Sequence, residues 1–390
     1  MRTSLSLLMM APLLASSAFF VACGGGTVSG VDEAPVDPGT GSSSSGGSSS
    51  GSVVEPPPFG LPALADLKSD EFTFMKPAGD TVCALGGEYG FAVRPGDPNK
   101  VVIEFEGGGA CFNNSTCAKP GSGGEGAVFK DFVVGSAYTG SSQVGLRDHG
   151  NTENPIQGWT HVIVPYCSAD VHWGDKETTY GENTIQHRGA KNTGAVLEYV
   201  YSQLKTPQRV FMTGCSAGGY GATYYTAGVK AHYPTAAVNH FSDSAAGVMP
   251  EPFFSTLSDA WGFQSTFPTE IGSGAEFTKL SYIFKGMAAK YPDVHMSQYN
   301  TVSDITQSLF FSLMGGSGWQ AGMLANIGEL VKEVPTFREY MSDGTVHCII
   351  EKNDFYSKQI ADTKLSTWVG NIANGTPVSN VNCPSCKLPE

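Results

Sequence analysis

The most reactive arrangement in the sequence is a serine flanked by glycines. Residues Gly214–Gly218 satisfy the G-x-S-x-G pattern of a serine nucleophile, with Ser216 at the centre. The run Arg209–Thr213 before them is typical of a buried strand, and the small-residue stretch Tyr220–Ala231 after them can form a helix. A sharp strand-to-helix turn needs glycines, because side chains there would block the close approach of the two elements. The context therefore favours a catalytic Ser216 over an ordinary glycine-rich turn.

Acyl transfer by a serine also needs backbone N–H groups for the oxyanion that develops on the substrate. One such donor normally belongs to the residue after the nucleophile, here Ala217, and others come from a glycine-rich loop after an earlier strand. The segment Gly107–Ala110 follows the β-branched run Val101–Phe105 and fits that place. We therefore expect the amides of Gly108, Gly109 and Ala217 to form an oxyanion hole. An ordinary glycine turn is the alternative.

Short runs of β-branched and aromatic residues alternate with helical segments along the chain. Such alternation predicts an α/β fold, with a mostly parallel central sheet and helices on both faces. In such sheets, active sites form beyond the carboxyl ends of the strands. The expected strands are 101–105, 161–166, 209–213, 237–241 and 294–299, and the helix expected between the second and third of them is 189–204.

Three sequence blocks resemble the pectinacetylesterase/Notum family. They are Glu106–Cys117, Val164–Val171 and Gly214–Gly219, and they stand in the order found in that family. The resemblance extends loosely over residues 61–356. It implies an α/β-hydrolase-like fold and a Ser-Asp-His triad that removes ester-linked acyl groups. Gly109–Ala110 departs from the relatives that carry a tryptophan beside the oxyanion hole.

The resemblance also implies a base and an acid for Ser216. His347 lies in a late loop, where the family keeps its catalytic histidine, and Asp304 follows the penultimate strand, where the family keeps its triad carboxylate. Asp243, at the end of another expected strand, is the alternative acid. Either aspartate could instead cap a helix. The other histidines after the nucleophile are expected to be structural: His232, His240 and His295.

These residues together predict a serine carboxylesterase that hydrolyses O-acyl esters, of short acetyl type, through an acyl-enzyme. One alternative is a hydrolase of longer acyl esters or polyesters, and another is a catalytically silent member of the fold that binds carbohydrate or lipid. The aromatic residues Trp261, Phe263 and Phe267 would line a pocket in the first case, or belong to a lid or the core.

The net charge and the sequence motifs indicate which classes of partner and cofactor the chain can bind. The 36 acidic and 23 basic residues give a net charge of −13, which disfavours binding to nucleic acid. The expected partner is a small-molecule or polysaccharide ester substrate. No cofactor and no metal are expected, because no HExxH or comparable ligand spacing occurs. A metal-assisted hydrolase built on His172–Asp175 is the alternative.

The N-terminal residues are typical of an exported protein. Residues 1–23 predict a signal peptide, and Phe20–Cys23 resembles a bacterial lipobox, which would tether the chain to a membrane through lipidated Cys23. Cleavage with secretion, or a retained anchor, are the alternatives. Residues 24–60 are rich in Gly, Ser and Pro and predict a linker, which leaves 61–390 as the hydrolase domain.

Eight further cysteines, an even number, predict disulfides in an exported chain. Cys111 and Cys117 flank a turn-like segment and are expected to pair with each other. Cys383 and Cys386 would form a terminal disulfide, or half of a zinc site. The remaining pairings stay open among Cys83, Cys167, Cys215 and Cys348.

Overall fold

The computed structural model of the chain describes residues 57–118, 128–140, 143–251 and 253–388. The predicted signal peptide, Cys23 and almost all of the predicted linker lie outside the described residues. None of the helices in the described ranges combines the length and the apolar character needed to cross a bilayer.

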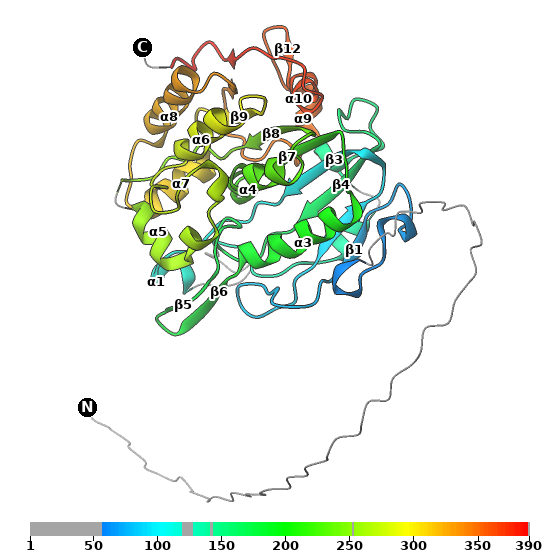
Figure 1. Ribbon diagram of the computed structural model, residues 1–390. Helices are drawn as coiled ribbons and strands as arrows, with labels where there is room; N and C mark the ends of the chain where they lie inside the picture. The colour runs from blue at the N-terminus through cyan, green and yellow to red at the C-terminus, as the bar shows by residue number, and fades with distance from the viewer. Residues whose placement is uncertain (1–56, 119–127, 141–142, 252, 389–390) are drawn as a thin grey trace, which may run out of the picture. The chain divides into compact units, whose positions relative to one another are not determined.

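A nine-stranded sheet forms the centre of the described part of the chain (Figure 1). Strands β1 and β2 pair antiparallel with each other, and β2 pairs antiparallel with β4, whereas the other neighbouring strands are parallel. In spatial order the strands are β1 (Thr73–Met75), β2 (Phe91–Arg94), β4 (Trp159–Val164), β3 (Asp97–Phe105), β7 (Arg209–Cys215), β8 (Ala237–Asp243), β9 (His295–Thr301), β10 (Phe337–Ser342) and β13 (Val381–Asn382).

Helices cover both faces of this sheet. Neighbouring side chains of a strand point to opposite faces. In β8, His240 bonds to Thr223 of α4, whereas the next residue, Phe241, packs against Trp368 of α10. The α-helices are α1 (Asn114–Cys117), α2 (Ser136–Thr139), α3 (Gly189–Gln203), α4 (Ala217–His232), α5 (Phe253–Trp261), α6 (Ser281–Lys290), α7 (Ile305–Leu313), α8 (Trp319–Glu333), α9 (Asp354–Ser357) and α10 (Leu365–Ala373).

Smaller elements complete the described structure. Two hairpins lie outside the main sheet: β5 (Lys176–Tyr180) with β6 (Asn183–His187), and β11 (Gln359–Ile360) with β12 (Thr363–Lys364). The 3-10 helices are η1 (Pro58–Gly60), η2 (Leu64–Asp66), η3 (Gly145–Arg147), η4 (Phe263–Thr266) and η5 (Thr269–Ile271).

The α/β fold and all five predicted strands are confirmed, with ends that differ by up to four residues. The helix predicted from Tyr220 begins at Ala217, directly after the nucleophile candidate. Strands β1, β2, β10 and β13 were not predicted. His240 is a buried structural residue of β8, as expected, and His232 stacks on Tyr201 at the end of α4.

All eight described cysteines form disulfides. The predicted pair Cys111–Cys117 is confirmed. Cys383 and Cys386 also pair with each other, so the zinc alternative for them is wrong. The two open pairings are Cys83–Cys167 and Cys215–Cys348.

The parallel strands bring the candidate residues to one edge of the sheet. Strands β3, β7, β8, β9 and β10 are successive neighbours, so their carboxyl ends lie side by side. The segments at these ends carry Gly107–Ala110 after β3, Ser216 after β7, Asp243 as the last residue of β8, Asp304 after β9 and His347 after β10.

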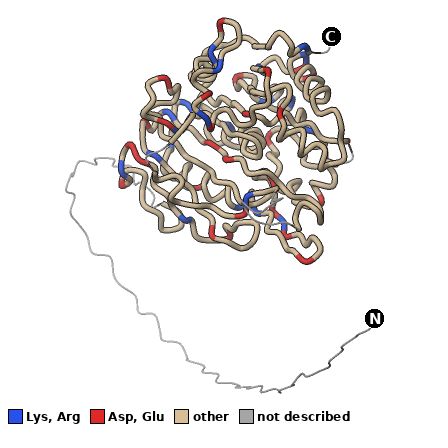
Figure 2. The backbone as a smooth tube through the Cα atoms, turned by 180° about the vertical axis from the view of Figure 1, so that it is seen from behind, with Lys and Arg blue, Asp and Glu red and all other residues tan. Residues whose placement is uncertain are grey.

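Charged residues are distributed along the described chain. Figure 2 shows basic and acidic positions interspersed among uncharged ones, without a continuous basic stripe along the described backbone. That the chain does not bind nucleic acid stays a prediction from its net charge of −13.

Candidate active site

Ser216 occupies a strained turn between β7 and α4. Its backbone φ is 55°, in the left-handed region that L-residues rarely adopt, and its N–H donates to the Asp243 carbonyl at 2.9 Å. Gly218 makes the turn possible, because a Cβ there would lie 1.9 Å from the Phe105 carbonyl oxygen. This sharp, strained turn places the serine side chain beyond the carboxyl end of the sheet, at the N-terminus of α4.

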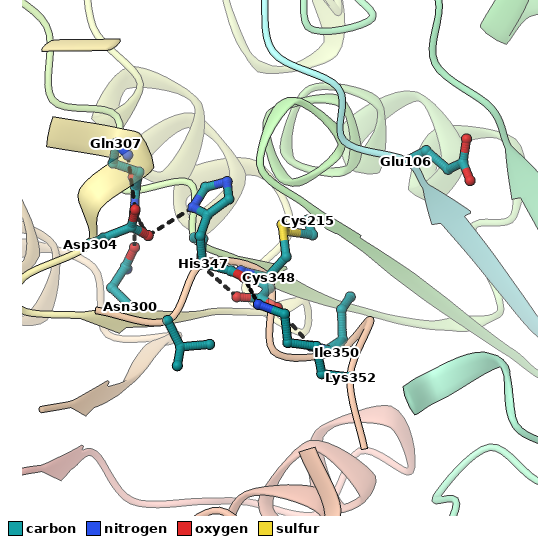
Figure 3. The surroundings of a disulfide bond; sticks show 12 residues. Glu106, Cys215, Asn300, Asp304, Gln307, His347, Cys348, Ile350 and Lys352 are labelled. Carbon is teal, nitrogen blue, oxygen red and sulfur yellow. Dashed lines mark hydrogen bonds and ion pairs between the residues drawn. A yellow bond between two sulfur atoms is a disulfide. The ribbon is translucent and has the colours of Figure 1, made fainter. Parts of the chain in front are cut away.

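His347 and Asp304 form a hydrogen-bonded pair beside this turn (Figure 3). His347 Nδ1 lies 2.8 Å from Asp304 Oδ2, and the other ring nitrogen, Nε2, has no partner within the described residues. His347 lines the same pocket as Ser216. The carboxylate fixes the ring and leaves Nε2 available to a group in the pocket.

Asp304 is also the N-cap of α7, so the capping alternative is confirmed, and its role as the triad acid stays a prediction. Its Oδ1 accepts from the Gln307 N–H at 2.9 Å. The Gln307 amide donates to Oδ2 at 3.1 Å, beside the bond to His347. The carboxyl is fully buried. These hydrogen bonds fix the rotation of the Asp304 carboxylate, because donors hold both of its oxygens.

Asp243, the alternative acid, binds the backbone of the loop that carries His347 and not the imidazole. We call this loop, residues 343–353 between β10 and α9, the histidine loop. Its Oδ2 accepts from the Ile350 N–H at 2.8 Å, and its Oδ1 accepts from the Ser244 hydroxyl at 2.8 Å. Ser244 in turn accepts from the Cys348 N–H at 3.2 Å. Burial raises the pKa of Asp243 to about 6. The structure thus places Asp243 under the loop that carries the imidazole.

The glycine loop after β3 lines the same pocket through Gly109 and Ala110. Gly109 has φ 74°, and a Cβ there would lie 2.0 Å from the Val128 carbonyl oxygen. The carbonyl of Gly109 accepts from the Tyr166 hydroxyl at 2.8 Å, and that of Gly108 accepts from the Lys130 N–H. The amides of Gly108, Gly109 and Ala217 donate to no acceptor within the described ranges. Such amides are the donors that an oxyanion requires.

A buried ionic cluster holds the start of this loop. Glu106 accepts from Arg147 and Lys130, each at 3.0 Å, and from the Tyr138 hydroxyl at 2.7 Å. Burial acts to raise the pKa of Glu106, but Arg147 and Lys130 outweigh it and hold the pKa below its ordinary value. Arg147 also pairs with Glu104 at 2.6 Å. The cluster therefore contains a charged carboxylate directly before Gly107.

The pocket at these residues is mainly apolar. It encloses about 580 Å³, open mouth included, between the glycine loop, Ser216, His347 and helices α5, α7 and α8. Trp261 lines it, as one interpretation of the sequence allowed, whereas Phe263 and Phe267 belong to the core. The apolar lining consists of Val171, Val248, Met249, Leu257, Trp261, Phe310, Phe311, Met314 and Trp319.

The described residues offer no metal site at the segment proposed for one. His172 Nε2 bonds to the Glu106 carbonyl at 2.9 Å, and Asp175 pairs with Arg188 and Lys191. Cys215, His347 and Cys348 place ligand-type atoms together, but the two sulfurs are bonded to each other. Neither sulfur is then a thiolate able to bind a metal.

Comparison with known proteins shows to which family the chain belongs. The sequence profile of the pectinacetylesterase family matches residues 65–266, just over half of the chain. The chain belongs to the pectinacetylesterase family. The matched range includes the glycine loop and Ser216 but ends before Asp304 and His347.

Two curated relatives of this pectinacetylesterase-family chain match over shorter stretches. Pectin acetylesterase 11 of Arabidopsis thaliana is 28% identical over 151 residues, which cover 37% of each chain. The palmitoleoyl-protein carboxylesterase NOTUM of Schmidtea mediterranea is 28% identical over 146 residues, 36% of this chain and 26% of that protein. The chain thus matches 37% and 26% of the length of these two relatives.

A solved structure shows the same fold. The Wnt deacylase Notum from Drosophila aligns with a TM-score of 0.55 at 18% identity, over 82% of this chain and all of that one. The resemblance to the pectinacetylesterase/Notum family and the α/β-hydrolase-like fold are therefore confirmed.

The sequence did not indicate several residues of the site. Glu106 and Tyr166 stand in the blocks that resemble the family, but their contacts, like those of Gln307 and Arg147, were not indicated, because most of their partners lie far away along the chain. The bond between Cys215 and Cys348 was one of several open pairings. A signal did exist for it, since each cysteine adjoins a residue singled out for chemistry, Ser216 or His347.

Proposed function

We propose that this pectinacetylesterase-family chain is a serine carboxylesterase that acts through Ser216, His347 and Asp304. The observation that carries the proposal is the imidazole of His347, bonded to Asp304 at 2.8 Å, with Nε2 free in the pocket that Ser216 lines. That is the arrangement in which an imidazole can serve as a general base for a serine.

The proposed reaction has two halves. His347 Nε2 takes the proton from the Ser216 hydroxyl as the oxygen attacks the ester carbonyl. The Gly108, Gly109 and Ala217 amides bind the resulting oxyanion, and Asp304 stabilises the charged imidazole. The imidazole then protonates the departing alcohol and leaves an acyl-serine. Water, deprotonated by the same nitrogen, releases the acid and restores the enzyme.

The substrate class is an O-acyl ester of a small molecule or a polysaccharide. Short acyl groups of the acetyl type are the first candidate, from the resemblance to the family. A second candidate, a longer acyl ester or a polyester, is favoured by the pocket, because its lining is apolar over helices α5, α7 and α8.

Export is part of the proposal. Four disulfides fit an oxidising compartment. We propose that residues 1–23 direct export, that lipidated Cys23 tethers the chain to the bacterial cell envelope, and that residues 61–390 form the hydrolase domain. Radiolabelled palmitate incorporated into the wild type but not into Cys23→Ala supports the tether, and labelling of neither protein contradicts it.

An esterase assay tests the proposal. The purified protein is given p-nitrophenyl esters from acetate to palmitate, with Ser216→Ala beside it. We expect turnover that the variant lowers by about 10³-fold or more. A peak at acetate supports the short-chain candidate, and a peak at eight or more carbons supports the second. Folded protein without turnover contradicts the proposal and favours a binding member of the fold.

A chelator serves as the matched control for the metal-assisted alternative. Because the proposed mechanism uses only protein groups, dialysis against EDTA should leave the rate unchanged. A rate that falls with EDTA and returns with added Zn²⁺ contradicts a metal-free mechanism.

A further inference from the structure

One disulfide connects the two reactive segments of the site. Cys215 directly precedes Ser216, and Cys348 directly follows His347, 133 residues apart in the sequence (Figure 3). Their Cα atoms lie 5.4 Å apart. The covalent link therefore spans from the end of β7, which carries the serine, to the loop that carries the imidazole.

Backbone strain is present at this link. Cys348 has φ 62°, and Ser216, next to its partner, has φ 55°. A residue other than glycine in this region costs about 1–3 kcal/mol and persists only where its surroundings enforce it. The serine is enforced by the tight strand-to-helix turn at Gly218. The histidine loop has no helix or strand of its own from 343 to 348 and depends on its attachments.

The other attachments of the loop come from different strands. Ser244 and Asp243, at the end of β8, hold the Cys348 and Ile350 amides. Thr301, the last residue of β9, donates its hydroxyl to the Val346 carbonyl at 2.9 Å. These bonds hold the loop next to Asp304, which also follows β9. Among the described contacts of the loop, the Cys215–Cys348 disulfide is the covalent bond to β7, the strand that directly precedes Ser216.

We propose that the Cys215–Cys348 disulfide fixes the position of His347 relative to Ser216, so that both cysteines are positioning residues for the reaction. The inference rests on the proposed function. Without the bond, the Asp304–His347 pair stays formed, because its supports come from β8 and β9. The distance from the imidazole to the serine oxygen becomes variable. A misplacement of about 1 Å at a reacting pair lowers rates by about 10²-fold.

The test compares two double variants. Cys215→Ala/Cys348→Ala removes the link, and Cys383→Ala/Cys386→Ala removes the C-terminal disulfide as the control. Wild type and Ser216→Ala run beside them, well below each melting temperature. We expect the first variant to lose about 10- to 100-fold in kcat with KM within about threefold, because the pocket is untouched. The control should stay within about twofold of the wild type.

A third variant separates positioning from stability. In Cys215→Ala/Cys348→Gly, glycine adopts a φ of 62° without strain, so the melting temperature should recover relative to the alanine pair. The kcat should stay low, because the link is still absent. A kcat within about threefold of the wild type in either Cys215/Cys348 variant overturns the inference. An inactive wild type overturns the proposed function, and this inference with it.

Partial reduction of the folded wild type covers the case in which these variants do not fold. The protein is treated with a phosphine reductant for increasing times, alkylated, assayed and digested for mass spectrometry. We expect activity to fall in step with alkylation of Cys215 and Cys348 while near-UV circular dichroism is retained. Full activity in protein that is alkylated at both cysteines overturns the inference.

Discussion

Asp304 Oδ2 lies 2.8 Å from His347 Nδ1, although 43 residues separate the two in the sequence. The same carboxyl caps α7 through its other oxygen. The orientation of the imidazole is thus tied to the start of a helix, which is a rigid support for a reacting group.

Two amide substitutions distinguish the two aspartates. Asp304→Asn keeps the cap but cannot stabilise a charged imidazole, so we expect kcat to fall by about 10²- to 10⁴-fold. Asp243→Asn retains an acceptor for the Ile350 amide, so kcat should fall less than about tenfold. Steady-state kinetics on one ester measure both. Equal losses would contradict the assignment of Asp304 as the triad acid.

The Tyr166 hydroxyl supports the oxyanion loop. It donates to the Gly109 carbonyl at 2.8 Å and accepts from the Val171 N–H at 2.9 Å. Tyr166→Phe leaves that buried amide unpaired, which costs about 1–3 kcal/mol of unfolding free energy. Because the Gly109 peptide is released as well, we expect kcat to fall about tenfold. A variant that loses stability but keeps full kcat would show that the loop does not depend on this bond.

Narrowing the pocket should change acyl selectivity. Val248 lines the apolar pocket and is half-buried, so Val248→Phe can fill part of the space. We expect kcat/KM for esters of eight or more carbons to fall about tenfold, while acetate stays within about threefold. Val144→Phe, on an exposed side chain outside the pocket lining, is the matched control. An equal loss for acetate and long-chain esters would show that this pocket does not hold the acyl chain.

The buried cluster under the glycine loop should make stability depend on pH. Burial acts to raise the pKa of Glu104, but Arg147 and His161 outweigh it and lower the pKa to about 2 from 4.5. A carboxyl with a lowered folded-state pKa contributes stability that is present above pH 4.5 and is lost as the pH falls toward 2. The contribution is about 3 kcal/mol for this shift.

Urea unfolding of the wild type and Glu104→Gln at a series of pH values measures this contribution. The stability difference between them should shrink by about that amount between pH 7 and pH 2.5. Glu71→Gln, on an exposed side chain that pairs with Lys68, should show little pH dependence. A difference that stays constant for Glu104→Gln would contradict the ionic role of this residue.

Much of the fold could be predicted because the central strands are apolar enough to identify. The runs before Glu106 and Ser216 are buried on both faces and read as continuous hydrophobic segments. Strand β10 escaped prediction because Arg338 and Glu339 lie in its middle. Glu339 is 1% exposed, and its burial raises its pKa to about 7.

The sequence indicates which residues form the candidate site, but it does not indicate how these residues contact one another. Ser216 and the glycine loop have local patterns, because strand-to-helix turns restrict which residues fit. Asp304 and His347 were assigned through the resemblance to the family, since nothing local pairs residues from two different loops. The Cys215–Cys348 bond was undetermined for a similar reason, because the four cysteines without an assigned partner allow three sets of pairings.

The most direct test of the central claim is covalent labelling of the nucleophile. The purified protein is treated with a fluorophosphonate, which reacts with activated serines, and the adduct is located by peptide mass spectrometry. We expect one adduct per chain, on Ser216, with loss of esterase activity in proportion. We also expect His347→Ala to slow labelling by at least about 10²-fold. An adduct on another residue, or full activity in protein labelled at Ser216, would contradict the assignment of Ser216 as the nucleophile.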